Sequence, residues 1–205
     1  MQKHSHLQLA KALLNTYGGF SARRYDYAFL FGSFQPDCNP LSYLKGSLRC
    51  KTFGGHTYGN NRAFIEKRIH RLRRRDHWLL WQYYTLGKLS HYLSDAFTLP
   101  HNPHFPGRGW DHHVYETELR HRLDHLLTEK QPVERVPLAD LPGEIHRLHE
   151  QYLSEEEFGV DTDLRYIFHA NELLMASCRP VPLDLEEIGD RIAGELAPDY
   201  AVSRI

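Results

Sequence analysis

The residues of this sequence best suited to chemistry lie in two short segments that each pair a histidine with a carboxylate. His91 and Asp95 are four residues apart, and His112 and Glu116 repeat that spacing. On an α-helix, residues four apart project from the same face, so each pair can offer a nitrogen and an oxygen to one ion. A single pair of this kind is also common as a salt bridge or a helix cap. Two such pairs close together predict a metal-binding role.

His101 lies between the two pairs, six residues after Asp95 and directly after Pro100, where a helix has to end. The segment therefore offers five nitrogen or oxygen ligands from facing helices and the loop between them. Helical bundles build metal sites in their cores in this way. Asp95 also lies on an otherwise apolar helix face, where a buried carboxylate is costly unless it is paired or bound to a metal.

The composition agrees with metal chemistry. Fifteen of the 205 residues are histidine, whereas only three are cysteine and no Cys-x-x-Cys pair occurs. This argues against a disulfide framework and against zinc sites made of thiolates. The histidines in charged helical stretches are expected on the surface: His70, His77, His121, His125, His146, His149 and His169.

The charge is divided unevenly along the chain. Residues 1–110 hold 16 Lys and Arg against 5 Asp and Glu, and residues 111–205 hold 9 against 21. Six of the nine residues 67–75 are basic. A basic half suits an anionic substrate such as a phospholipid, a nucleotide or a nucleic acid. A solvated helix face paired with the acidic half explains the same pattern.

The elements that must position these residues are predicted to be helices almost throughout. An apolar stripe at helical spacing covers residues 7–14 and ends at two glycines, and two helices follow one another from residue 61 to about residue 99, with a break near residues 75–76. Residues 20–60, rich in glycine and proline, are expected to form short helices and long loops. Further helices are expected at residues 110–128, 139–156, 161–177 and 184–196. Four aromatic residues are expected in the core: Trp78, Trp81, Tyr83 and Tyr84.

The predicted fold is therefore all-α, a helical bundle with long loops that carry metal ligands. The length fits one domain over residues 1–205, with a metal-site region at about 4–116 and an acidic helical part at about 117–205. No apolar segment approaches the ~20 residues that span a membrane, and the first residues lack a signal-peptide pattern. A cytoplasmic location is expected.

The spacing resembles that of the bacterial zinc-dependent phospholipases C and the related single-strand-specific zinc nucleases. Their motif is His-x3-Asp, a histidine six residues later, and His-x3-Glu or His-x3-Asp on the next helix. This chain matches it at His91, Asp95, His101, His112 and Glu116. The family also has a histidine at the start of the first helix and an Asp and a His in the following loop region, which His6, Asp37 and His56 match in order. The resemblance covers residues 6–116.

The resemblance implies two to three Zn²⁺ ions. One would be held by Asp37, His56, His91 and Asp95, and a second by His101, His112 and Glu116. Asp95 would bridge to a third ion that is shared with His6 and the N-terminus. Secreted relatives use an N-terminal tryptophan at that third site, whereas this chain has Met1. Either the Met1 amine or His4 would take its place, or the third ion would be weakly bound or missing.

The implied activity is hydrolysis of a phosphodiester by a metal-activated water, with Asp37 and Asp95 as the catalytic carboxylates. The substrate would be a phospholipid headgroup, a nucleotide or another phosphodiester. Two alternatives remain: a nuclease or nucleotidase on the same cluster, and a non-catalytic zinc-binding helical module. An HD-type phosphohydrolase is excluded, because the chain has no His-Asp dipeptide.

Overall fold

The regular elements are helices in the computed structural model, which describes residues 1–38, 57–107 and 109–180 and contains no strand in those ranges. The elements are α1 (Lys3–Thr16), α2 (Arg23–Cys38), α4 (Tyr58–Arg73), α5 (Leu80–Ala96), the short 3-10 helix η2 (Leu99–His101), α6 (Trp110–Glu129), α7 (Leu141–Leu153) and α8 (Val160–Cys178). The all-α prediction is confirmed. The helix expected at 184–196 lies outside the described residues.

One helix departs from the expected pattern. Residues 20–60 were predicted to form short helices and long loops, but α2 is a single helix of 16 residues that contains Gly32 and Pro36. Pro36 stands in the last turn, so the missing proline N–H costs only one hydrogen bond near the end of the helix. Gly32 has a packing role that local sequence does not reveal.

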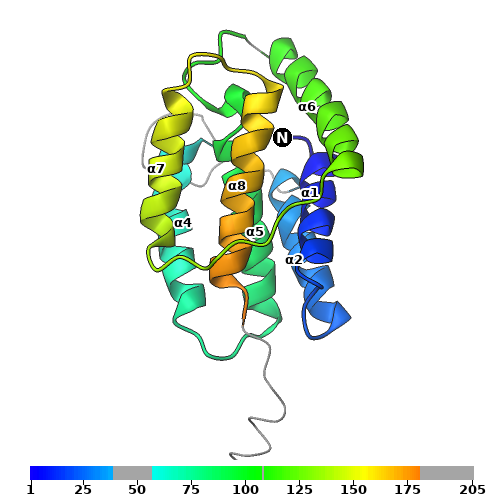
Figure 1. Cartoon of the computed structure of the whole chain (residues 1–205), viewed down its shortest axis with the longest axis vertical. Coiled ribbons are helices and arrows are strands. Elements are labelled where there is room, and N and C mark those ends of the chain that lie inside the picture. The colour runs from blue at the N-terminus through cyan, green and yellow to red at the C-terminus, as the bar shows by residue number, and fades with distance from the viewer. Residues whose placement is uncertain (39–56, 108, 181–205) are drawn as a thin grey trace, which may run out of the picture.

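Helix α5 lies in the middle of the molecule. It packs against α2, α4, α8 and α1, and Figure 1 shows α5 and α8 between α4 and α7 on one side and α1, α2 and α6 on the other. Leu86, Leu89 and Leu93 of α5 are fully buried. Removing each leucine side chain from water contributes about 1.5–3 kcal/mol to folding.

Helices α2 and α5 touch through two glycines. A Cβ atom on Gly87 would lie 2.0 Å from the Phe29 carbonyl oxygen, and one on Gly32 would lie 2.2 Å from the Tyr84 carbonyl oxygen. The two backbones therefore meet where any larger residue would force them apart. This close approach brings the last turns of α2 beside the face of α5 that carries His91.

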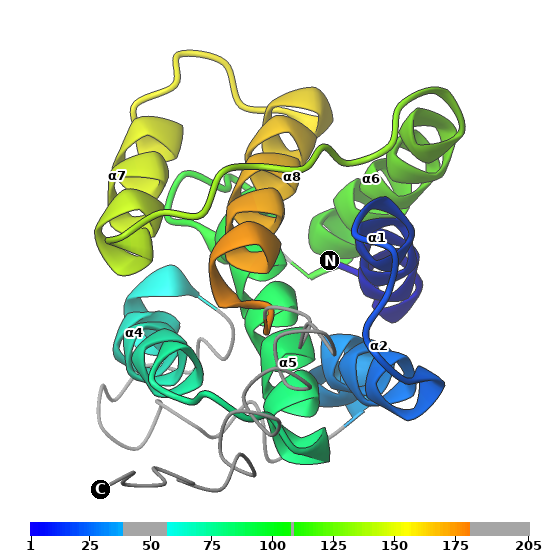
Figure 2. The same ribbon diagram turned by 60° about the horizontal axis from the view of Figure 1, so that its bottom comes forward.

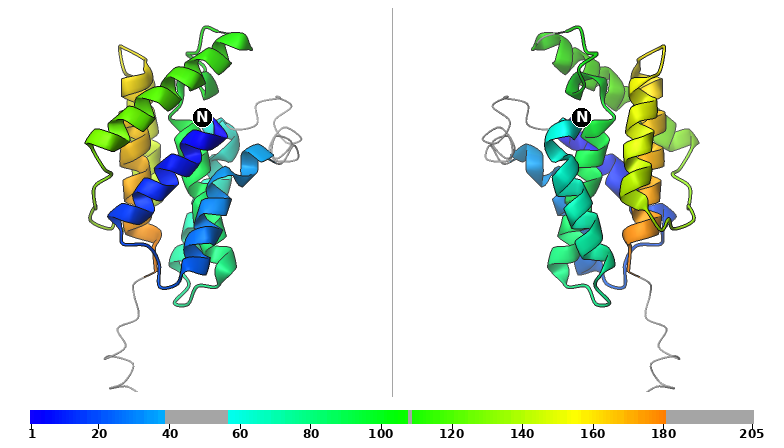
Figure 3. Two further views of the ribbon diagram at one scale, coloured as in Figure 1. Left: turned by 90° about the vertical axis from the view of Figure 1, so that its right-hand side faces the viewer. Right: turned by 90° about the vertical axis from the view of Figure 1, so that its left-hand side faces the viewer.

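The turn after α1 directs the chain back along the bundle. Gly18 and Gly19 have φ angles of 69° and 73°, a left-handed backbone that favours glycine, and the Gly19 N–H bonds the Leu14 carbonyl at 2.8 Å. Figure 3 shows α1 and α6 lying obliquely across the other helices. Figure 2 shows the N-terminus between α1, α5 and α6. The start of the chain is thus placed in the interior of the helix assembly.

Two predictions about side-chain burial are wrong at single residues. Trp78 and Tyr83 are buried and Tyr84 is half-buried, but Trp81 is 62% exposed. His149, expected on the surface, is buried, and its ring stacks on Tyr58 with centroids 4.0 Å apart. Local sequence does not reveal the burial of either residue, because it depends on which helix face meets a neighbour.

None of the helices within the described ranges is long and apolar enough to cross a membrane.

Candidate metal centre

Helices α1, α2 and α5 bring four of the predicted ligands together. His91 Nε2 lies 3.2 Å from Asp95 Oδ2 and 3.5 Å from Asp37 Oδ1. His6 Nε2 lies 3.2 Å from Asp95 Oδ1, and its ring stacks on that of His91 at 3.9 Å. His6, His91 and Asp95 are almost completely buried. The i, i+4 spacing on α5 thus places His91 and Asp95 side by side, as predicted.

A second group is formed by η2 and α6. His112 Nε2 lies 3.0 Å from Glu116 Oε1, and His101 Nε2 lies 3.4 Å from the same oxygen. His112 is 36% exposed, whereas His101 and Glu116 are 14% and 13% exposed. This group is therefore nearer the surface than the first.

The amine of Met1 joins the two groups. It lies 2.7 Å from Asp95 Oδ1, 2.9 Å from Glu116 Oε1 and 3.4 Å from His101 Nε2. His4, the other candidate for this position, is 54% exposed, and its Nε2 lies 4.0 Å from Asp124. Of the two residues, the structure thus places the Met1 amine, and not the His4 side chain, between the carboxylates.

Protonation states in the cluster suit metal binding. Burial, reinforced by the neighbouring His91, lowers the pKa of His6 to about 3, so its imidazole is neutral at pH 7. Burial would raise the pKa of Asp95, but the Met1 amine and the histidines around it hold that pKa well below its usual range. The pKa of Glu116 is lowered in the same way by His101 and His112 against the effect of burial. Neutral imidazoles beside ionised carboxylates are the ligand forms that zinc requires.

Two observations test whether these residues fit a cation. The Nε2 atom of His6 is buried and makes no hydrogen bond with correct geometry to the described residues, although Asp95 is close by. The positively charged Met1 amine occupies the point where Asp95, Glu116 and His101 converge; burial opposes its charge, yet the two carboxylates raise its pKa to about 10. Nitrogen and oxygen donors without thiolate are typical of catalytic zinc. The residues fit a divalent cation.

Surrounding residues hold the ligands on α5 in place. His91 Nδ1 lies 2.9 Å from the Ser33 carbonyl oxygen, which leaves Nε2 directed at the carboxylates. The buried Ser90 hydroxyl donates to Asn171 Oδ1 at 2.7 Å, and Asn171 Nδ2 donates to the Ser94 hydroxyl at 3.1 Å. These bonds fix α5 against α8 at the level of the ligands.

Asp163 is a positioning residue that the sequence analysis missed. Its carboxylate accepts hydrogen bonds from the Leu99 N–H at 2.8 Å, the Tyr115 hydroxyl at 2.9 Å and the Tyr152 hydroxyl at 2.7 Å. Leu99 begins the 3-10 helix that carries His101, and Tyr115 precedes Glu116. Asp163 lies 47 positions after Glu116 on α8, so no local spacing indicated its role.

The cluster opens into a pocket of about 550 Å³. Its lining includes Asp37, Asp95, His101, His112 and Glu116, together with Met1, Gln2, Lys3, His4 and Leu7. Lys3 also lines this pocket and supplies an ammonium group, for which no motif in the sequence gave a signal. Arg62, on the basic helix α4, pairs with Glu66 at 2.8 Å and does not line this pocket. His56 lies outside the described residues.

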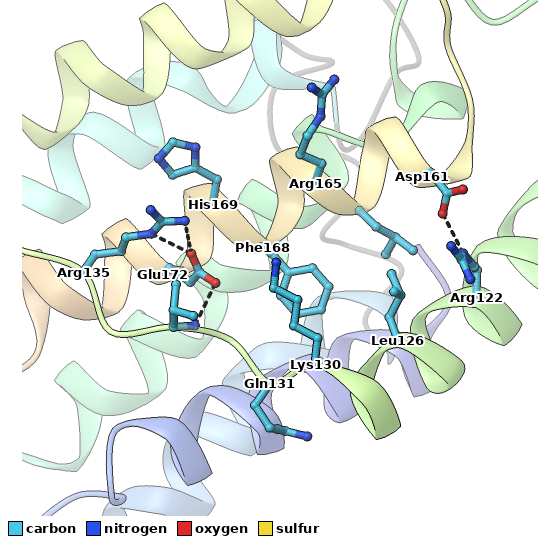
Figure 4. A pocket seen from close by; sticks show the side chains of 12 residues that line it. Arg122, Leu126, Lys130, Gln131, Arg135, Asp161, Arg165, Phe168, His169 and Glu172 are labelled. Atoms are coloured by element: carbon cyan, nitrogen blue, oxygen red, sulfur yellow. Dashed lines mark hydrogen bonds and ion pairs between the residues drawn. The ribbon is translucent and has the colours of Figure 1, made fainter.

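A second pocket, of about 380 Å³, lies between α6, α8 and the segment that follows α6 (Figure 4). Its charged lining is largely neutralised by ion pairs, Arg122 with Asp161 at 2.6 Å and Arg135 with Glu172 at 2.7 Å. Glu172 also accepts the Val133 N–H at 2.9 Å, so these contacts hold the segment after α6 against α8. The charged residues around this pocket are therefore explained by their role in holding two segments together. The predicted metal ligands are not among its lining residues.

Comparison with known proteins agrees with this geometry. The family model described as zinc dependent phospholipase C matches residues 5–159, a range that includes every predicted side-chain ligand from His6 to Glu116. Searches of curated proteins and of solved structures gave no match. The match spans most of the chain, and the chain belongs to the zinc-dependent phospholipase C family.

Proposed function

We propose that this protein is a zinc-dependent phosphoesterase that hydrolyses a phosphodiester in the pocket above the cluster. The observation that carries the proposal is the convergence of His6, Asp37, His91, Asp95, His101, His112 and Glu116 from four helices and a 3-10 helix. Their sequence positions span more than 100 residues. Four histidines and three carboxylates thus meet in one place, a set of nitrogen and oxygen donors that suits zinc.

The ligands divide into groups that suit two to three Zn²⁺ ions. His91, Asp95 and Asp37 would hold one ion, with His56 as the further predicted ligand, and His101, His112 and Glu116 would hold another. Asp95, His6 and the Met1 amine would hold a third, once the amine has lost its proton. Bound zinc lowers the pKa of a coordinated water toward ~7 and stabilises negative charge on phosphoryl oxygens.

The protein's own residues would then carry the rest of the reaction. Asp37, which lines the pocket and is 16% exposed, orients the attacking water and accepts its proton. The water oxygen forms a bond to phosphorus, the ester P–O bond breaks, and the leaving alcohol takes up a proton equivalent to the one that Asp37 accepted, which restores the carboxylate. Lys3 on the pocket lining attracts the anionic substrate.

The deciding experiment combines metal content with a substrate screen. Protein purified without a histidine tag or chelator is analysed by plasma mass spectrometry, and we expect two to three zinc ions per chain. The same preparation is assayed on phosphatidylcholine and on single-stranded DNA, and we expect hydrolysis of the phospholipid.

Each other result contradicts part of the proposal. Faster cleavage of DNA would assign the cluster to a nuclease. Bound zinc without hydrolysis of any phosphoester would indicate a non-catalytic metal-binding module. A folded protein without zinc would refute the metal centre itself.

A further inference from the structure

The start of α5 and the residue before it expose a group of apolar side chains to water. Leu79, Leu80 and Trp81 are consecutive and are 70%, 52% and 62% exposed. We call these three residues the apolar tip. Single exposed apolar residues are ordinary, but three in succession at one turn form a patch that favours contact with an apolar environment.

Aromatic residues extend this patch onto α2. The Trp81 and Tyr84 rings have centroids 4.8 Å apart, and the Tyr84 and Phe31 rings follow at 5.8 Å. Phe31 is 52% exposed. Tryptophan and tyrosine are enriched where a protein meets the boundary between lipid and water, because their rings are apolar and their edges are polar.

Four arginines border the apolar tip. Arg68, Arg71, Arg74 and Arg75, which we call the arginine cluster, line a pocket of about 560 Å³ together with Trp81. Arg71, Arg74 and Arg75 are exposed, and none of them forms a salt bridge with a carboxylate among the described residues. The arginine cluster thus places positive charge directly beside the apolar tip.

The surface lies at the opposite end of the bundle from the start of α1. Figure 1 shows the α4–α5 connection at the lower end of the molecule, whereas the N-terminus, which marks the metal cluster, lies in the upper half. Trp81 precedes His91 by ten residues on α5, a rise of about 15 Å along the helix axis. The surface is thus separate from the pocket proposed for hydrolysis.

We propose that the apolar tip and the arginine cluster dock the protein on the surface of an anionic phospholipid bilayer. The leucines and Trp81 would enter the headgroup region, and the arginines would pair with the lipid phosphates. Charge complementarity and the apolar tip together distinguish this partner from two others. A nucleic acid would pair with arginine and tryptophan but would leave both leucines in water, and a two-fold dimer would set the same arginines against each other.

The test measures co-sedimentation of the 205-residue chain with phosphatidylcholine vesicles that contain or lack phosphatidylserine. We expect much tighter binding when phosphatidylserine is present than when it is absent, and weaker binding as salt rises. The Arg74→Gln/Arg75→Gln variant should bind roughly thirtyfold more weakly, since each basic residue contributes about fivefold near an anionic surface. Lys11→Gln/Lys130→Gln removes the same charge from two other exposed sites and should retain most of the affinity.

A second pair of variants tests the apolar tip. Leu80→Ser/Trp81→Ser should reduce binding by about tenfold or more, whereas Val136→Ser, at a residue that is 79% exposed elsewhere, should have no effect. Brominated lipid should quench tryptophan fluorescence in the parent protein, and less so in Trp81→Phe. Circular dichroism confirms that each variant is folded.

Four results would overturn the proposal. The first is failure of the parent protein to bind anionic vesicles, and the second is equal vesicle binding by the tip variants and their controls. The third is displacement of the protein from vesicles by a single-stranded oligonucleotide to which the tip variants still bind. The fourth is self-association of the parent protein that the tip variants abolish. Vesicle binding by a folded Asp95→Asn variant should equal that of the parent, because docking does not depend on the metal centre. Loss of hydrolysis alone therefore leaves the docking surface intact.

Discussion

Asp95 is the residue on which the proposed centre depends most. Its Oδ1 faces the Met1 amine and His6, its Oδ2 faces His91, and it is 1% exposed. An apolar side chain could not replace this buried carboxylate, because the cationic and metal-ligating groups around it need an oxygen partner. The role of Asp95 in the proposed centre follows from the contacts of its own two carboxylate oxygens.

We predict that Asp95→Asn lowers zinc content and abolishes hydrolysis together. The amide keeps the shape but supplies no negative charge and only one oxygen ligand. His146→Ala is the control, because His146 lies on the polar side of α7 and pairs with Glu150 at 3.3 Å. Metal analysis and an activity assay on both variants check this. Equal behaviour of the two would show that the site is assigned to the wrong residues.

His149 should make the free energy of unfolding decrease as the pH is lowered. Burial lowers its pKa from 6.5 to about 4. The folded state therefore prefers the neutral ring of His149. The contribution of this residue to the free energy of unfolding is complete above pH ~6.5 and is lost as the pH falls toward 4. Between pH 7 and pH 5 the loss is about 2 kcal/mol for a shift of this size.

We expect His149→Gln to reduce this loss. Urea unfolding at pH 7 and pH 5 measures the change in unfolding free energy for parent and variant, and other titrating groups cancel in the comparison. An equally steep decline in both proteins would mean that His149 does not titrate in this range.

Helices α2 and α5 set the geometry of the cluster at the scale of elements. Their contact through Gly32 and Gly87 brings Asp37 and the Ser33 carbonyl to His91. On the opposite side, Asp163 of α8 holds η2 and α6, and with them His101 and Glu116. The ligands are therefore positioned by helix packing as much as by their own spacing.

Gly87→Ala should destabilise the fold by roughly 3 kcal/mol or more, because the added methyl would meet a backbone oxygen that has no freedom to move aside. It should also weaken zinc binding, since α2 carries Asp37. Gly59→Ala is the matched control: a Cβ there meets nothing within 4 Å, so its stability should be unchanged or slightly higher. Thermal unfolding and zinc titration distinguish the two, and a stable Gly87→Ala variant would argue against the close contact.

At the scale of the whole molecule, the cluster connects helices that are far apart in sequence. Ligands come from α1, α2, α5, η2 and α6, so bound zinc would join the first and later parts of the bundle. Ions that bind only the folded chain stabilise it by mass action, by about 3–4 kcal/mol when they are present at 100 to 1,000 times the dissociation constant.

Removal of zinc by a chelator should therefore lower the melting temperature by about 5–15 °C for a chain of this size. Calorimetry with and without chelator measures the shift, and Asp95→Asn should show a smaller one. No shift in the parent protein would mean that zinc contributes nothing to the folded state.

Most of the helices, and the spacing of the ligands along them, follow from local patterns in the sequence. Period-3.6 apolar patterns and the i, i+4 pairs of His91 with Asp95 and His112 with Glu116 are local properties, because one helical turn dictates which residues share a face. The resemblance to a zinc family, stated from the order of those ligands, is confirmed by the family match.

Tertiary structure alone decided what depends on contacts between distant segments. The sequence did not indicate that α2 continues through Pro36, that Gly87 touches α2, that Asp163 holds two ligand-bearing elements or that Trp81 faces solvent. Gly87 and Asp163 act through partners on other elements. Local preference describes a residue's own turn, whereas burial and positioning are set by which helix faces meet when the chain packs into one core.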